Sequence, residues 1–74
     1  MITSFQTWIQ TQTGRGDAVG RLARDVSVDD RAPDGIWKAN WIDHLMVRNA
    51  SLAAMAAFEE AWGEYSGLFL DKYR

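Results

Sequence analysis

The stretch from Ala50 to Tyr65 constrains the fold of this chain more than any other, because its length, composition and periodicity all indicate one helix. Large side chains recur along it at helical spacing and share one stripe: Leu52, Met55, Glu59, Trp62 and Tyr65, with Phe58 beside them. Glutamates occupy much of the remaining helix surface. The rest of the chain is therefore expected to supply helices that cover this stripe.

The length and composition indicate one small domain, residues 1–74. A chain of this size buries only roughly 60% of the surface that its unfolded form exposes, so its stability is expected to be modest. The sequence contains no cysteine and a single histidine, His44, which excludes a disulfide framework and a thiolate zinc site. Apolar side chains, including four tryptophans, therefore have to hold the fold together.

The charges of the chain nearly balance, with eight basic against ten acidic residues and a net charge of −2. No global field therefore favours binding to phosphate backbones or to anionic lipid. No apolar run approaches the roughly 20 residues of a membrane span, and the first residues lack the basic region of a signal peptide. We therefore expect a cytoplasmic protein.

Two helices are predicted in the first part of the chain. Thr3 and Gln6 have the spacing of a capping box and start a helix over residues 4–12. Asp17 stands at an N-cap position after a glycine-rich turn and starts a second helix over residues 18–27. The apolar stripe of this second helix consists of Val19, Leu22, Ala23 and Val26.

A polar loop over residues 29–35 separates these helices from the third, and Pro33 disfavours helix just before it. Asp34 is the expected N-cap of the third helix. The large side chains at helical spacing in that helix are Trp37, Trp41, His44 and Leu45.

Two glycines in the last helix bear on what packs against it and on where it ends. Gly63 costs about 1 kcal/mol against alanine in a helix interior, which predicts that another group approaches its backbone closely. Gly67 fits either a C-cap or a helix that runs on, so the tail 67–74 receives no assignment.

An ordered series of residues resembles the YozE-like family of short bacterial proteins over residues 3–66. The series consists of Ser4-Phe5 with Trp8, the segment Asp17 to Asp25 with Leu22-Ala23, Asp30-x-x-Pro33, and Met55-x-x-Phe58-x-x-Ala61-Trp62-x-x-Tyr65. The resemblance implies a four-helix fold similar to sterile alpha motif domains, in agreement with the helices predicted above. The predicted fold class is therefore all-α, a compact four-helix bundle. The resemblance supplies no activity, and Ala32 departs from the aromatic residue that often precedes the loop proline.

The same patterns predict the core. It consists of Phe5, Trp8, Leu22, Trp41, Leu45, Met55, Phe58, Trp62 and Tyr65. An alternative use of the tryptophans is a platform that stacks on bases or peptides. Trp37, one turn from a helix start and next to Lys38, is the tryptophan most expected to lie outside the core.

Few residues are candidates for a catalytic or a metal site. His44 next to Asp43 suggests a general base or a pH switch, but residues adjacent on a helix do not face each other, so a packing histidine is preferred. The carboxylates of Asp29, Asp30 and Asp34 could gather a hard cation, but their spacing fits no calcium loop, and solvation and capping account for them. No catalytic residue, metal ligand or cofactor is predicted.

The function predicted from the sequence is a non-catalytic interaction module that binds a protein partner or a second copy of itself. The candidate interaction surface consists of Arg15, Arg21, Arg24, Lys38, Glu59, Glu60 and Glu64. The arginines of the second helix and the acidic last helix could form complementary faces between two copies. The alternative is a weak nucleic-acid-binding domain that uses the arginines, although the net charge argues against it.

Overall fold

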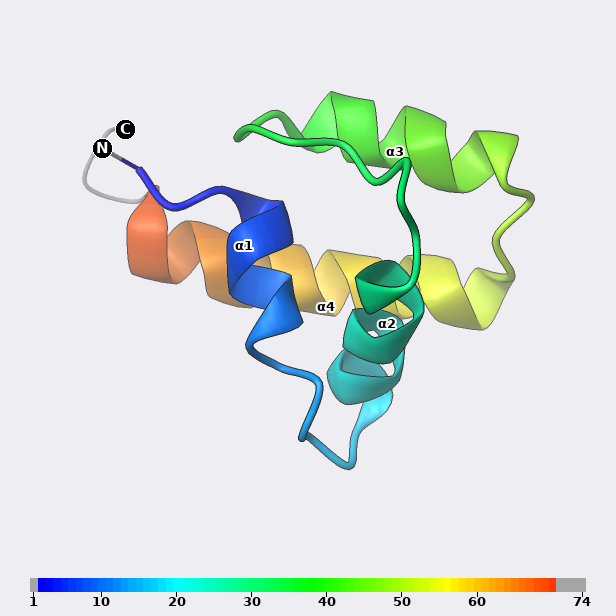
Figure 1. The fold of residues 1–74 in the computed structure, drawn as a ribbon, viewed down its shortest axis with the longest axis horizontal. Helices are drawn as coiled ribbons and strands as arrows, with labels where there is room; N and C mark the ends of the chain where they lie inside the picture. Colours follow the sequence, from blue (N-terminus) through cyan, green and yellow to red (C-terminus); the bar gives the residue numbers. More distant parts are fainter. Residues whose placement is uncertain (1, 71–74) are drawn as a thin grey trace.

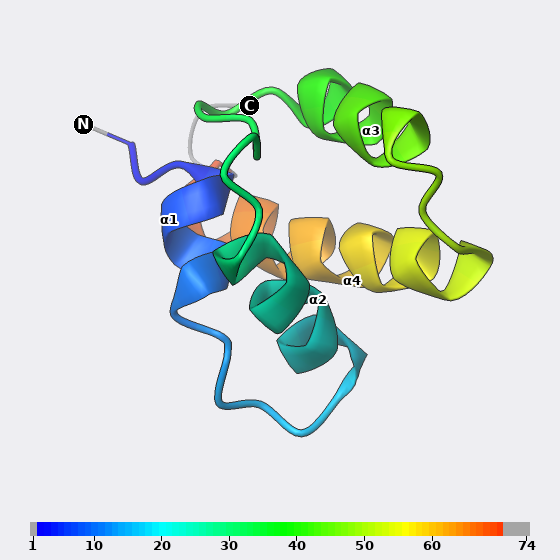
Figure 2. The same ribbon diagram turned by 45° about the vertical axis from the view of Figure 1, so that its right-hand side comes forward.

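The computed structural model describes residues 2–70, which form four helices (Figure 1). The helices are α1 (Phe5–Gln10), α2 (Ala18–Ser27), α3 (Lys38–Val47) and α4 (Leu52–Phe69). Helix α4 is the longest, and α1, α2 and α4 pack directly against one another. Helix α3 lies alongside α4 in both views (Figures 1 and 2). The predicted all-α, four-helix class is confirmed.

The cap of α1 differs from the predicted one. The Ser4 side chain, not that of Thr3, accepts the free backbone N–H of Thr7 at 3.1 Å. Gln6 does not complete a capping box, because its side-chain amide donates to the carbonyl of Ala32 in the distant loop. The helix itself ends at Gln10, two residues earlier than predicted.

Helix α2 begins and ends where the sequence predicted. The Asp17 carboxylate caps it by accepting from the backbone N–H of Gly20 at 3.0 Å. Gly20 is also the point where the preceding loop touches the helix, since a Cβ built there would lie 2.0 Å from the Arg15 carbonyl oxygen. A glycine is therefore required where the loop crosses the first turn of α2.

Helix α3 starts later than an Asp34 cap would place it. Its N-cap residue is Trp37, which makes no side-chain capping bond, while the Asp34 carboxylate accepts from the adjacent N–H of Gly35. Gly35 has a φ of 94°, a conformation that suits glycine, so the chain turns before the helix begins. The predicted Asp34 cap was therefore wrong.

Helix α4 runs through Gly67 to Phe69, so Gly67 is not a C-cap. The prediction for Gly63 was wrong, because a Cβ built at that position meets no described atom within 4 Å beyond the backbone of its own helix. Of the unassigned tail, residues 71–74 lie outside the part that the structure describes.

The core is an aromatic cluster centred on Phe5, whose side chain is fully buried. Its ring lies within 6 Å, centroid to centroid, of the rings of Trp8, Trp41, Phe58, Trp62 and Tyr65. These residues, together with Leu22 and Leu45, are all buried. Trp37, the expected exception, is 66% exposed.

The stripe predicted along α4 is wrong at its first turn and at Glu59, which is exposed. Met55 is only partly buried against the core, and Leu52 is 90% exposed. Two residues three apart on a helix are offset by about 60° around its axis. Residues reached from Tyr65 by repeated steps of three toward the start of α4 therefore turn progressively away from the core and toward solvent. The buried residues of α4 are Ala57, Phe58, Ala61, Trp62 and Tyr65, so the predicted positions of Trp62 and Tyr65 are confirmed.

Candidate functional site

Arg15, one of the predicted surface cations, is bound within the molecule. Its guanidinium forms a bidentate ion pair with the carboxylate of Glu64 on α4, with Nη1–Oε1 and Nη2–Oε2 distances of 2.7 and 3.0 Å. It also contacts the Asp17 carboxylate at 2.7 Å. The hydrogen bond from Arg15 holds the pKa of Glu64 below its usual range, and the bonds that Arg15 donates to Glu64 and then to Asp17 raise the pKa of Arg15.

Two further predicted cations are similarly engaged. Arg24 donates from Nη1 to the carbonyls of Thr13 and Arg15, at 2.9 and 3.0 Å, and so holds the loop that precedes α2. Lys38, at the start of α3, pairs with Glu59 on α4 at 2.7 Å. Glu64 and Glu59 of the acidic helix are therefore paired with Arg15 and Lys38 of their own chain. The arginines of α2, which the sequence suggested as their partners in a second copy, form no ion pair with α4 among the described residues.

The seven predicted surface residues do not share one face. The Arg15–Glu64 pair joins the loop before α2 to α4, whereas the Lys38–Glu59 pair joins the start of α3 to α4. Glu60 is exposed on α4. Arg21 and Arg24 line a groove beside α2, whereas Lys38 and Glu59 line a separate hollow.

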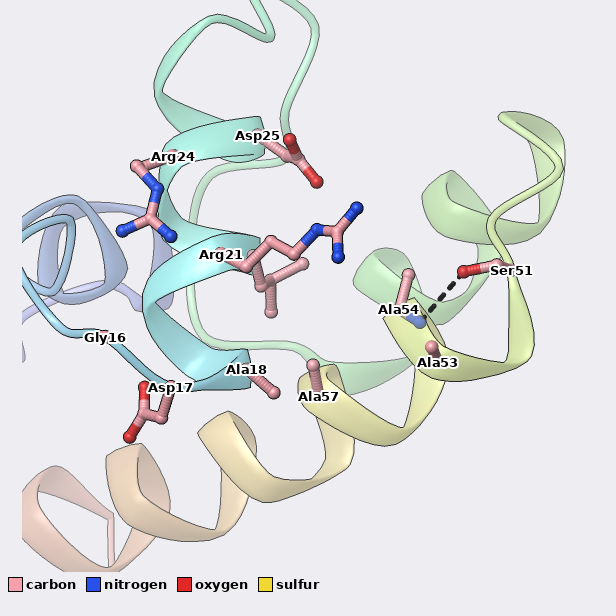
Figure 3. A pocket seen from close by; sticks show the side chains of 11 residues that line it. Gly16, Asp17, Ala18, Arg21, Arg24, Asp25, Ser51, Ala53, Ala54 and Ala57 are labelled. Atoms are coloured by element: carbon pink, nitrogen blue, oxygen red, sulfur yellow. Dashed lines mark hydrogen bonds between the residues drawn. The ribbon is translucent and has the colours of Figure 1, made fainter.

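This groove lies between α2 and the first half of α4 and has a volume of about 480 Å³ (Figure 3). Its lining is part apolar and part polar. The small and apolar side chains are Ala18 and Leu22 from α2, and Ala53, Ala54 and Ala57 from α4, and the polar ones are Asp17, Arg21, Arg24, Asp25 and Ser51. Arg21 and Asp25 project from α2 at its rim (Figure 3). Alanine side chains leave this space because they are too short to fill the gap between the two helices.

The groove continues toward the end of α3 as a second hollow of about 330 Å³, which shares Leu22 and Asp25 with the first. Val28, at the end of α2, lines this second hollow and is 85% exposed. Leu52 and Val47 are 90% and 86% exposed and stand next in sequence to residues that line it. Large apolar side chains therefore lie in water at this end of the molecule.

A second cluster joins the end of α2 to α3. The Asp29 carboxylate lies 2.6 Å from His44 Nε2 and 2.7 Å from Arg48 Nη1, and its side chain is only 7% exposed. Burial alone would raise the pKa of Asp29, but the hydrogen bonds from His44 and the Arg31 amide, with the charges of His44 and Arg48, hold it below its usual range.

The interpretation of Asp29 as a solvated loop carboxylate was therefore wrong. The sequence did carry one signal, because His44 and Arg48 stand four residues apart and so share a helix face that an acidic group could meet.

Neither a catalytic nor a metal arrangement accompanies this cluster in the described residues. Both oxygens of Asp29 are occupied by His44 and Arg48, and no hydroxyl of residues 2–70 is hydrogen-bonded to His44. No group of three or more His, Cys, Asp or Glu side chains in that range is placed to hold a metal ion. No helix in it has both the length and the apolar composition to span a bilayer. The cluster is built to fasten α3 to the end of α2.

The four helices around one aromatic core define a small all-α domain of the sterile alpha motif type. The chain belongs to the YozE SAM-like family, whose model, described as the YozE SAM-like fold, matches residues 4–67. This match confirms the resemblance seen in the sequence. No match was found among curated proteins or among solved structures.

Proposed function

We propose that this chain is a non-catalytic interaction module that binds a protein partner through the groove between α2 and the first half of α4. The observation that carries the proposal is the groove itself, where alanine and leucine side chains lie beside the charges of α2. It continues into the hollow lined by Val28, and the exposed side chains of Val47 and Leu52 stand next in sequence to residues of that hollow. Exposed apolar surface with a charged rim is the usual composition of a protein interface.

The bonds that the other predicted cations form within the chain also favour the groove as the binding surface. Arg15, Arg24 and Lys38 are already bonded to groups of their own chain. They are therefore less available to phosphates, and this weakens the case for nucleic-acid binding. Arg21 and Asp25, which flank the groove, have no side-chain bond to another described residue, so they remain available to orient a partner.

Site-specific photo-crosslinking in cells tests the proposal. A benzophenone side chain is placed at Ala53, which lines the groove, or at Ala56, an equally exposed alanine of α4 that does not line it. We expect discrete adducts from position 53, identified by mass spectrometry, and none from position 56. Equal adducts at both positions, or none at either, would contradict the proposed groove.

A further inference from the structure

One stripe of α2 borders the groove, and its residues are spaced as neighbours on a helix face. The stripe consists of Ala18, Arg21, Asp25 and Val28, separated by three, four and three residues. All four side chains are exposed. The Arg21 and Asp25 side chains, although four apart, form no ion pair with each other or with any other described residue. The stripe therefore offers one positive and one negative charge between two small or apolar ends.

This order of side chains is self-complementary when the stripe is reversed. A two-fold axis through its midpoint places Arg21 opposite Asp25 of the second copy, and Asp25 opposite Arg21. The same axis places Ala18 opposite Val28, so the smaller side chain at one end faces the larger one at the other. A two-fold interface requires this relation, in which residue i meets residue j and j meets i.

We propose that the groove is covered by a second copy of this chain, whose α2 lies antiparallel against α2 along this stripe. The inference rests on the proposed function and names its partner. Charge complementarity favours a second copy as the partner. When two such stripes lie antiparallel, the positive charge of each faces the negative charge of the other. Exposed apolar groups near Val28 would then be shielded by the partner helix.

The expected dimer is weak and sensitive to salt. Helix α2 is about 15 Å long, so the contact is smaller than the roughly 800 Å² per partner of a standard stable interface. The two charge pairs lie near the surface, where dissolved ions screen them. Association should therefore appear at high protein concentration and decrease as salt is added.

Charge reversal provides the test, with sedimentation equilibrium of the purified chain as the measurement. Arg21→Asp leaves two negative charges facing Asp25 residues, and Asp25→Arg leaves two positive charges facing Arg21 residues. Each variant alone should raise the dimer dissociation constant by roughly tenfold or more, because like charges then face each other. The double variant Arg21→Asp/Asp25→Arg should restore the dimer.

A mixture of the two single variants is the most specific measurement. In an antiparallel pair, every aspartate of the Arg21→Asp chain faces an arginine of the Asp25→Arg chain, so the two should form a heterodimer although neither forms a homodimer. The controls are Arg31→Asp and Asp43→Arg, at exposed positions outside the stripe, which should leave association unchanged. Circular dichroism checks that each variant is folded.

Three results would overturn the inference. The first is a wild-type chain that stays monomeric at all concentrations. The second is a dimer whose dissociation constant is the same in the charge-reversal variants, and the third is a pair of single variants that form no heterodimer when mixed. Crosslinks from position 53 to a different protein would uphold the proposed groove while this inference fails. Adducts at twice the mass of the chain would uphold both.

Discussion

Asp29 and His44 lie 2.6 Å apart, Oδ2 to Nε2, and this contact fastens α3 to the turn that follows α2. Helix α3 is the helix that packs least directly on the others, since α1, α2 and α4 form the mutual contacts of the backbone. Arg48 binds the second oxygen of Asp29 at 2.7 Å. One buried carboxylate therefore holds two side chains at the end of α3.

We expect Asp29→Asn to destabilise the protein by about 1–3 kcal/mol at neutral pH, because it weakens charged hydrogen bonds in a buried position. Urea denaturation followed by circular dichroism measures this loss. The matched control is Asp30→Asn, the exposed neighbour whose side chain has no partner among the described residues, and it should leave the midpoint unchanged. Similar losses in the two variants would show that Asp29 does not fasten α3.

The same contact predicts a loss of stability in acid. The folded chain holds the pKa of Asp29 below its ordinary value of 3.8, so the unfolded chain binds the proton more readily. The contribution of Asp29 is therefore fully present above that value and is lost as the pH falls through the lower pKa of the folded state. The wild type should lose more stability on acidification than Asp29→Asn does, and parallel curves would contradict this.

Phe5 is expected to be the most costly side chain to truncate, because it contacts five other aromatic rings and is fully buried. Phe5→Ala should cost about 3–5 kcal/mol, a large part of the stability of a small domain, and Trp62→Ala should cost a similar amount. The control is Trp37→Ala, which removes a larger ring that is 66% exposed and should change the free energy of unfolding by less than about 0.5 kcal/mol. A Phe5→Ala variant with the wild-type midpoint would contradict the described core.

Local sequence rules predicted the two ends and the buried face of α2, because the residues that set them lie within the helix or next to it. Asp17 caps it, and Val19, Leu22, Ala23 and Val26 all fall on its buried face. The same rules failed for Gln6 because a carbonyl 26 residues away binds its side chain. A capping rule that considers four neighbouring residues cannot include such a partner.

The candidate site could be predicted only in part for the same reason. The charged residues were identified, but the partner of Arg15 is Glu64, 49 positions away, and nothing in the spacing of the two residues indicates that they meet. The groove was not predicted at all. Its walls are alanines, which fit a helix pattern without showing whether a neighbouring helix leaves space beside them.

Gly20 in α2 and Gly63 in α4 differ in their surroundings and give a matched pair of substitutions. Gly63→Ala should stabilise the protein by about 1 kcal/mol, because alanine favours a helix interior and the added Cβ meets no atom within 4 Å. Gly20→Ala should destabilise it, since the added Cβ would lie 2.0 Å from the Arg15 carbonyl oxygen and force the loop away. Thermal melts of both variants should shift in opposite directions, and a common direction would contradict the close approach at Gly20.

Tyr65 ties the last helix to the start of the chain, because its hydroxyl donates to the Thr3 carbonyl at 2.6 Å while its ring lies in the core. Tyr65→Phe keeps the ring and removes this bond, so it should cost about 1 kcal/mol at neutral pH. Burial also raises the pKa of Tyr65 above its ordinary value of 10.0, which means that the folded chain favours the neutral hydroxyl.

The stability that Tyr65 contributes is therefore fully present below pH 10.0 and is lost as the pH rises through its higher folded-state pKa. Denaturation midpoints measured from neutral to strongly alkaline pH should fall more steeply for the wild type than for Tyr65→Phe. The two curves should approach each other at high pH, because the wild type loses there the advantage that the hydroxyl gives it at neutral pH. A constant gap between them across this range would mean that the Tyr65 hydroxyl titrates equally in the folded and unfolded chains, and would contradict its burial.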